Sequence, residues 1–106
     1  MPLNQAIKRM RMYDVSQMVV LEDDHVRGII DEGDILMALV HSADNANRPV
    51  SDFMTRRLET IAPEASMNDL VPIFRADRVA IVMDDNQYYG LITKMDLINY
   101  LRNKLA

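Results

Sequence analysis

The apolar and polar positions of this 106-residue chain follow one pattern that occurs twice. A shift of 62 residues brings apolar runs, an acidic turn and a glycine of the first half onto those of the second. Self-similarity of this kind indicates two copies of one supersecondary unit and favours pseudo-twofold symmetry. The identical pairs are Val20 and Val82, Asp23 and Asp85, Gly28 and Gly90, Ile30 and Ile92, Asp34 and Asp96, and Leu39 and Leu101.

Each copy is predicted to run helix, strand, strand, helix. In the first, apolar residues spaced i, i+3, i+4 and i+7 predict a helix over Leu3–Arg11. Strands are predicted at Met18–Leu21 and Val26–Ile30, joined by an acidic turn, and a helix at Asp34–His41.

The second copy adds a short strand, Leu58–Ile61, ahead of its first helix. Ser66 can cap that helix with Asp69 three residues on, whereas Pro72 inside it predicts a bend or an early break. Further predictions are strands at Ala80–Met83 and Tyr88–Ile92 and a helix over Lys94–Leu105. The side chains of this last helix expected to face inward are Leu97, Ile98, Leu101 and Leu105.

The fold class expected from these elements is mixed α/β, with two pseudo-symmetric repeats. The first repeat is placed at residues 1–41, a polar linker at 42–49 and the second repeat at 50–106, where Val50–Met54 reads as a short helical turn. The first repeat has no counterpart of the leading strand, so we expect it to be truncated.

Composition narrows the possible functions. The net charge of −4 gives little electrostatic support for a nucleic-acid partner. Without cysteine there is no disulfide and no thiolate metal site, and His25 and His41 lie in different predicted elements, so no metal site is expected. No apolar run has the length of a membrane span, no secretion signal is visible, and we expect a cytoplasmic protein.

Two segments carry a family resemblance. Gly90–Leu97, with the sequence Gly-Leu-Ile-Thr-Lys-Met-Asp-Leu, resembles the signature of CBS domains, and Val50–Thr55 looks like the segment that opens such a repeat. The signature falls twice between a predicted hairpin and a helix, so the chain resembles a tandem CBS pair. A narrower resemblance is to the regulatory tail of bacterial cystathionine β-synthases, which are pyridoxal-phosphate enzymes. The segments that carry it are Asp14–Gln17, Gly28–Asp34, Thr55–Thr60 and Tyr89–Thr93.

The resemblance implies an adenosyl ligand bound in clefts between the repeats. Asp96 would hold the ribose hydroxyls and Thr93 would face the phosphate, with Ile92 packed on sugar or base. Val15 and Ser16 would contact the adenine through their backbone. The other residues that the resemblance implies as ligand contacts are Asp34 and Ile30 of the first repeat and Leu58. On spacing alone, Thr93 and Asp96 could equally be a capping box that serves stability.

The first repeat departs from the signature. Asp31 stands where threonine or serine is expected, and its charge would repel a phosphate and attract a sulfonium. This favours S-adenosylmethionine over AMP, ADP or ATP, although Asp31 could merely cap its helix beside an empty site. Arg78 could offset that charge or touch the ligand, or be a solvated surface arginine.

The function expected is therefore a non-catalytic regulatory module, with no cofactor of its own and with an adenine nucleotide or S-adenosylmethionine as effector. It would control an attached enzyme of the cystathionine β-synthase or cysteine synthase type and form a homodimer, without nucleic-acid or membrane partners. The alternative is a structural dimerisation domain whose clefts are degenerate; methionine-rich helices suit an isologous interface.

Overall fold

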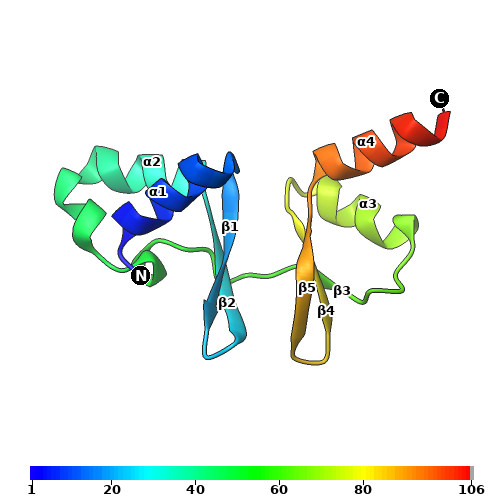
Figure 1. Cartoon of the computed structure of the whole chain (residues 1–106), viewed down its shortest axis with the longest axis horizontal. Coiled ribbons are helices and arrows are strands. Elements are labelled where there is room, and N and C mark those ends of the chain that lie inside the picture. The colour runs from blue at the N-terminus through cyan, green and yellow to red at the C-terminus, as the bar shows by residue number, and fades with distance from the viewer. Residues whose placement is uncertain (106) are drawn as a thin grey trace. The chain divides into compact units, whose positions relative to one another are not determined.

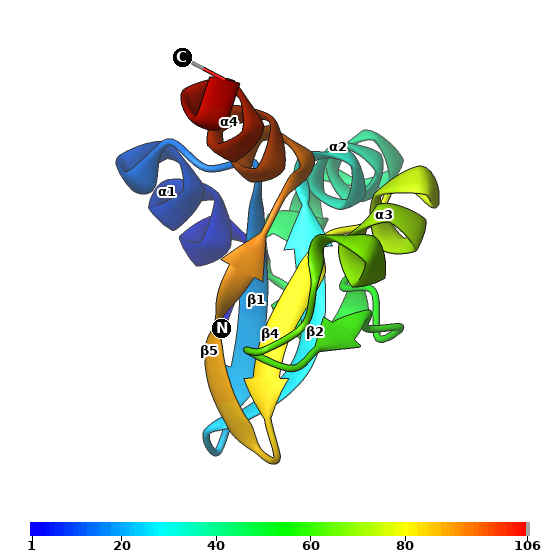
Figure 2. The same cartoon turned by 90° about the vertical axis from the view of Figure 1, so that its right-hand side faces the viewer.

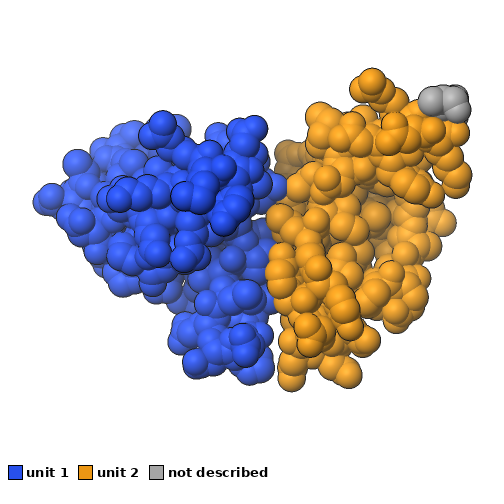
Figure 3. All heavy atoms as spheres, viewed as in Figure 1, with its two compact units in different colours: residues 1–57 blue, residues 58–106 orange. Residues whose placement is uncertain are grey.

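The computed structural model describes residues 1–105. The chain divides into two compact units, unit 1 at Met1–Arg57 and unit 2 at Leu58–Ala106 (Figure 3). Each unit combines two α-helices with a small sheet, so the expected mixed α/β class is confirmed (Figure 1).

Unit 1 is built on an antiparallel hairpin. Its elements are α1 (Leu3–Tyr13), β1 (Gln17–Glu22), β2 (His25–Asp31), α2 (Glu32–His41) and the 3-10 helices η1 (Ala43–Asn47) and η2 (Val50–Asp52). The turn residues Asp23 and Asp24 both have positive φ, 52° and 64°, as a two-residue turn matching strand twist requires. The two α-helices cover one face of the hairpin, α1 beside β1 and α2 beside β2 (Figures 1 and 2).

The core of unit 1 lies between these helices and the hairpin. The predicted apolar stripe of α1 and the inward-facing residues of β2 supply side chains to this core. Leu3 and Ile30 are completely buried in it. Its buried members are Leu3, Ala6, Met10, Ile30, Ile35, Ala38 and Val50.

The segment after α2 packs back onto unit 1. The Leu3 amide donates to the Arg48 carbonyl at 2.9 Å, and the Val50 amide donates to the Met1 carbonyl at 2.8 Å. Further on, Thr55 and Ile29 exchange two backbone hydrogen bonds of 2.8 and 2.9 Å. The residues that open the second repeat in sequence therefore belong, in their packing, to unit 1.

Unit 2 repeats the hairpin and adds a third strand. Its elements are β3 (Thr60–Ile61), α3 (Met67–Arg75), β4 (Ala80–Asp84), β5 (Gln87–Ile92) and α4 (Lys94–Leu105). β3 pairs parallel to β4, and β4 pairs antiparallel to β5. The register of the two hairpins agrees: Val20 faces Gly28 in one and Val82 faces Gly90 in the other, each just before a bulge.

Two predictions for unit 2 need correction. The predicted early break at Pro72 is wrong, since α3 begins at the Ser66–Asp69 capping box and continues past the proline to Arg75; a bend there stays a prediction. In α4, Leu97 packs against the core, but Ile98 and Leu101 are 52% and 38% exposed. The core is small, centred on Leu70, Ile73, Phe74 and Ala80, and α4 meets it at its beginning. The Leu105 side chain lies outside the described part.

Candidate functional site

The two strand-to-helix junctions have the same local geometry. In unit 2, the Asp96 carboxylate accepts the Thr93 amide at 2.8 Å, and the Thr93 hydroxyl accepts the Asp96 amide at 3.2 Å. In unit 1, Asp34 accepts the Asp31 amide at 3.1 Å, and Asp31 accepts the Asp34 amide at 2.8 Å. Both junctions are therefore reciprocal capping boxes.

Capping leaves these carboxylates capable of further hydrogen bonds. A carboxylate has about four acceptor positions on two oxygens. The box engages the Oδ2 atom of Asp34 and of Asp96, so the Oδ1 atoms can accept from a ligand. Thr93 and Asp96 can therefore cap the helix and contact a ligand at the same time.

The junctions differ in charge. Asp34 has a raised pKa, first because it is partly buried and second because the charge of Asp31 opposes its ionisation, although the hydrogen bond from the Asp31 amide works in the other direction. Thr93 carries no charge and keeps a hydroxyl hydrogen that can be donated, whereas an ionised Asp31 can only accept.

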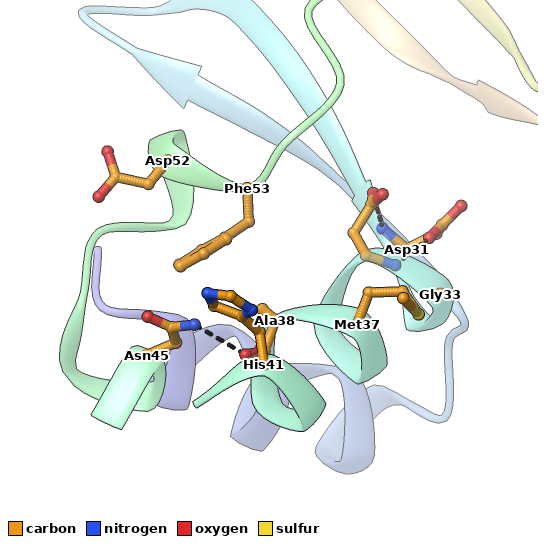
Figure 4. A pocket seen from close by; sticks show the side chains of 9 residues that line it. Asp31, Gly33, Met37, Ala38, His41, Asn45, Asp52 and Phe53 are labelled. Carbon is orange, nitrogen blue, oxygen red and sulfur yellow. Dashed lines mark hydrogen bonds between the residues drawn. The ribbon is translucent and has the colours of Figure 1, made fainter. Parts of the chain in front are cut away.

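An open groove of about 660 Å³ begins at the unit 1 junction. α2 forms one wall with Met37, Ala38 and His41, and Phe53 stands opposite (Figure 4). At its end, the Asn45 side chain donates to the Ala38 carbonyl at 2.7 Å, closing the last turn of α2.

Carboxylates surround the mouth and far wall of this groove. Asp31 and Asp34 lie at the start of α2. Asp52 lies beside Phe53 (Figure 4). Asp52, the last residue of η2, pairs with Arg48 at 2.8 Å. The Arg48 guanidinium also lies over the ring of Phe53, the next residue, at 5.7 Å from its centre. The N-terminus of α2 carries the acidic residues Asp31, Glu32 and Asp34, and of these Asp31 and Asp34 line the groove.

The groove wall was not found by sequence reasoning. The sequence pattern places Met37 in a helix, Asn45 in the linker, and Asp52 and Phe53 in the segment that opens the second repeat. No motif connects these four residues. Their proximity follows from the return of residues 43–57 onto unit 1, which a local hydrophobic pattern does not reveal.

Two basic residues of unit 2, Arg78 and Lys94, form ion pairs. Arg78 contacts Glu59 with 3.2 Å between Nη1 and Oε1. Lys94, the first residue of α4, pairs with Asp77 and lowers the pKa of that carboxyl by hydrogen bonding and charge. A cation therefore lies directly after Thr93, whereas an acidic residue, Glu32, follows Asp31.

The other predicted residues are distributed over both units. Val15 and Ser16 are exposed ahead of β1, and the Ser16 carbonyl accepts the Glu32 amide at 3.1 Å, which ties this segment to the start of α2. Leu58, Arg78 and Ile92 are half-buried in unit 2. Ile30 is fully buried in the core of unit 1, and its contact with a ligand stays a prediction.

Neither a metal site nor a membrane span is found in the described chain. Among residues 1–105, no three histidine, cysteine, aspartate or glutamate side chains gather in an arrangement that could hold a metal ion. Over the same residues, every helix is too short or too polar to cross a bilayer.

Known proteins share this sequence pattern. A relative from Haemophilus influenzae, described as a probable arabinose 5-phosphate isomerase, is 31% identical over 78 residues, which cover 70% of this chain. The chain spans 23% of that isomerase and 30% of an uncharacterised protein from Methanocaldococcus jannaschii.

Solved structures share the fold. A putative signal-transduction protein with CBS domains from Burkholderia ambifaria has a TM-score of 0.88 at 20% identity, covering 100% of this chain and 80% of its own. The CBS domain pair of protein MJ0100, in complex with 5′-methylthioadenosine and S-adenosyl-L-methionine, has a TM-score of 0.83 at 20% identity, covering 98% and 84%. At such identities the likeness establishes the architecture.

A family model decides the assignment. The model described as CBS domain matches residues 1–41 and 50–103, nearly the whole chain in two copies. Together with the repeated hairpin, glycine and capping box, this match shows that the chain belongs to the CBS-domain family as a tandem pair.

Proposed function

We propose that this chain is a regulatory module that binds an adenosyl ligand with residues of both repeats. The observation that carries the proposal is the equivalence of Asp34 and Asp96, each the third residue of a helix that directly follows a glycine-containing strand. A structural relative bound to S-adenosyl-L-methionine and 5′-methylthioadenosine adds support.

The chemistry of each junction suits a ribose. The two hydroxyls of a vicinal diol can donate to one carboxylate, and hydrogen bonds to an ionised acceptor are among the stronger ones. Asp34 and Asp96 retain one oxygen each for this purpose while the other holds the helix cap. Because the cap fixes the carboxylate before the ligand arrives, little side-chain entropy is lost on binding.

The charge difference predicts ligand selectivity. At the Thr93 junction, the free hydroxyl hydrogen and the positive end of the α4 dipole favour a phosphate, as in AMP, ADP or ATP. At the Asp31 junction, two carboxylates disfavour a phosphate and favour the sulfonium of S-adenosylmethionine. In water-like surroundings one charge pair at 4 Å contributes about 1 kcal/mol, roughly a fivefold change in affinity.

Calorimetric titration with S-adenosylmethionine and with AMP tests the proposal. We expect Asp31→Thr to shift the preference toward AMP by about fivefold or more, and Asp34→Asn and Asp96→Asn each to weaken binding at its own junction. Asp85→Asn, in the β4–β5 turn, makes the same charge change away from both junctions and should bind as the wild type does. Unchanged ligand preference in Asp31→Thr would refute the charge argument.

Binding itself can be tested through stability. A ligand present at a hundredfold excess over its dissociation constant raises the free energy of unfolding by about 2.7 kcal/mol. The absence of any thermal shift with AMP, ADP, ATP or S-adenosylmethionine would refute ligand sensing.

The regulated enzyme is proposed to be of the cystathionine β-synthase or cysteine synthase type. The basis is the likeness of residues 14–17, 28–34 and 55–60 to that regulatory tail. A ligand that binds one arrangement of the repeats more tightly than another shifts the equilibrium toward that arrangement, by as much as its two affinities differ. The shift would change the activity of an attached catalytic domain. Fusion of this chain to such a domain should make its turnover respond to the bound adenosyl compound; an unresponsive fusion would contradict this assignment.

Homodimerisation is a second candidate function, favoured by one apolar surface. On α2, the side chains of Leu36, Met37 and Val40 are 61%, 67% and 72% exposed. A dimer burying this face would dissociate in Leu36→Glu, which sedimentation equilibrium would detect. If the wild type is monomeric at tens of micromolar, this candidate fails while ligand sensing is unaffected.

A further inference from the structure

The groove of unit 1 continues beyond the junction that we propose for the ribose. It begins at Asp31 and Asp34 and follows α2 to His41, entirely within unit 1. At 1.5 Å per residue, the seven residues from Asp34 to His41 cover about 10 Å. A ribose held at Asp34 would therefore leave most of the groove open to the group attached at the 5′ carbon of the sugar.

The far end of the groove offers both hydrogen-bond donors and acceptors. The Asn45 side chain is only 6% exposed and donates one N–H to the Ala38 carbonyl at 2.7 Å. A carboxamide has a second N–H and an imidazole has at least one, so Asn45 and His41 can both donate to an anion. Arg48 contacts the Oδ2 atom of Asp52, and the Oδ1 atom of this carboxylate can accept from an ammonium group. A group that carries both charges therefore fits this end.

Apolar groups line the stretch between the two ends. Met37 and Ala38 form the α2 side, and the Phe53 ring stands opposite (Figure 4). Methylene groups that pack here leave water, which favours binding. Along the groove the surroundings are thus first acidic, then apolar, and then suited to a zwitterion.

The tail of an adenosyl sulfonium has its groups in the same order. In S-adenosylmethionine the positive sulfur follows the 5′ carbon, methylene groups come next, and an ammonium and a carboxylate share the last carbon. From the ribose to the tail carboxylate there are about seven bonds, or roughly 9 Å in extended form, which matches the length of the groove. A triphosphate has a similar length, but its negative charges would pass the carboxylates of Asp31, Asp34 and Asp52.

We propose that this groove holds the α-amino-acid tail of an adenosyl sulfonium whose ribose is bound by Asp34. The ammonium group donates to Asp52, and the tail carboxylate accepts from Asn45 and His41. Because Arg48 offsets part of the charge of Asp52, the tail is recognised by hydrogen bonds more than by net charge. This inference rests on the proposed function and adds to it the part of the ligand that unit 1 recognises.

Three ligands that differ only beyond the 5′ carbon provide the test. S-adenosylmethionine has the sulfonium and the tail, S-adenosylhomocysteine has the tail without the positive charge, and 5′-methylthioadenosine has neither. Calorimetric titration uses the full chain with Asp96→Asn, which weakens the other junction. S-adenosylhomocysteine should bind about five- to tenfold more tightly than 5′-methylthioadenosine, and S-adenosylmethionine more tightly still.

A matched pair of variants locates the tail. Asp52→Ala removes the acceptor and should reduce the preference for S-adenosylhomocysteine about three- to fivefold. Its affinity for 5′-methylthioadenosine should not change, which also shows that the variant is folded. Asp44→Ala makes the same change at an exposed position of η1 outside the groove and should keep the full preference.

Two results would overturn the inference while ligand sensing stands. One is equal binding of S-adenosylhomocysteine and 5′-methylthioadenosine, because the tail would then make no favourable contact. The other is a preference that survives in Asp52→Ala, or that is lost equally in Asp44→Ala, because the tail would then be held elsewhere. If none of the three ligands binds even to the wild-type chain, the proposed function fails together with this inference.

Discussion

Substitution of Gly28 by alanine should weaken unit 1 through a single steric conflict. Gly28 is buried on β2, where the segment Met54–Thr55 crosses it. A β-carbon at this position would lie 2.7 Å from the Met54 Sδ atom and 2.7 Å from the Thr55 carbonyl oxygen. The methionine side chain can rotate away, but the carbonyl belongs to the backbone.

The cost follows from the displacement that relieves this contact. The ordinary separation between such atoms is about 3.5 Å, so Thr55 must retreat by roughly 0.8 Å. The Thr55 carbonyl accepts the Ile29 amide at 2.9 Å, and the same movement takes this bond beyond normal length. Overpacking costs about 1–3 kcal/mol and each weakened hydrogen bond about 1 kcal/mol, so we expect a loss of about 2–4 kcal/mol.

Urea denaturation followed by circular dichroism would measure this loss. Gly33→Ala is the control, because its β-carbon meets only the Asp31 Oδ1 atom, at 3.2 Å, which need shift by only a few tenths of an ångström within the capping box, and alanine favours the helix. Gly33→Ala should leave stability unchanged or slightly higher. A loss of stability below 0.5 kcal/mol in Gly28→Ala, or an equal loss in both variants, would show that Thr55 is not fixed against Gly28 by its backbone hydrogen bonds to Ile29.

Three further predictions concern the junction, the end of α2 and the proline of α3. Because the pKa of Asp34 is raised, its ionisation opposes folding: this carboxyl favours the folded state at low pH, and that contribution declines as pH rises from about 3.9 through the folded pKa. Carbon NMR of Asp34 should show a raised midpoint that falls in Asp31→Asn; a midpoint at or below the ordinary value would contradict this. Asn45→Ala should cost about 1–3 kcal/mol by removing the hydrogen bond to α2, whereas exposed Asn47→Ala should stay within 0.5 kcal/mol in the same denaturation assay. Pro72→Ala should raise stability by about 2 kcal/mol by restoring a helical amide, and a measured decrease would mean that the proline is favourable in place.

Local patterns were sufficient for much of the fold. The stripe of α1, the paired apolar runs and the capping residues depend on neighbours a few positions apart, and their elements form as predicted within a residue or two at most ends. The Ser66–Asp69 and Thr93–Asp96 boxes were likewise visible as spacings and have the expected hydrogen bonds.

Long-range packing accounts for what sequence missed. Whether Ile98 faces a core depends on how far α3 extends beneath α4, and no periodicity encodes that distance. The burial of Ile30 beside α1 and Val50, whereas its repeat counterpart Ile92 is half-buried, also depends on packing that the repeat pattern does not encode. The boundary of unit 1 depends on the pairing of Thr55 with Ile29, two residues far apart in the chain.

The return of residues 43–57 sets an order of events during synthesis. A nascent chain that has emerged only through His41 contains α1, the hairpin and α2, but lacks Val50 for the core and Thr55 for the free side of β2. Folding of unit 1 on the ribosome must therefore wait until the opening residues of the second repeat have left the exit tunnel. Gene fusions or proteolytic dissections that cut between the repeats at the sequence boundary would, for the same reason, deprive unit 1 of its last core segment.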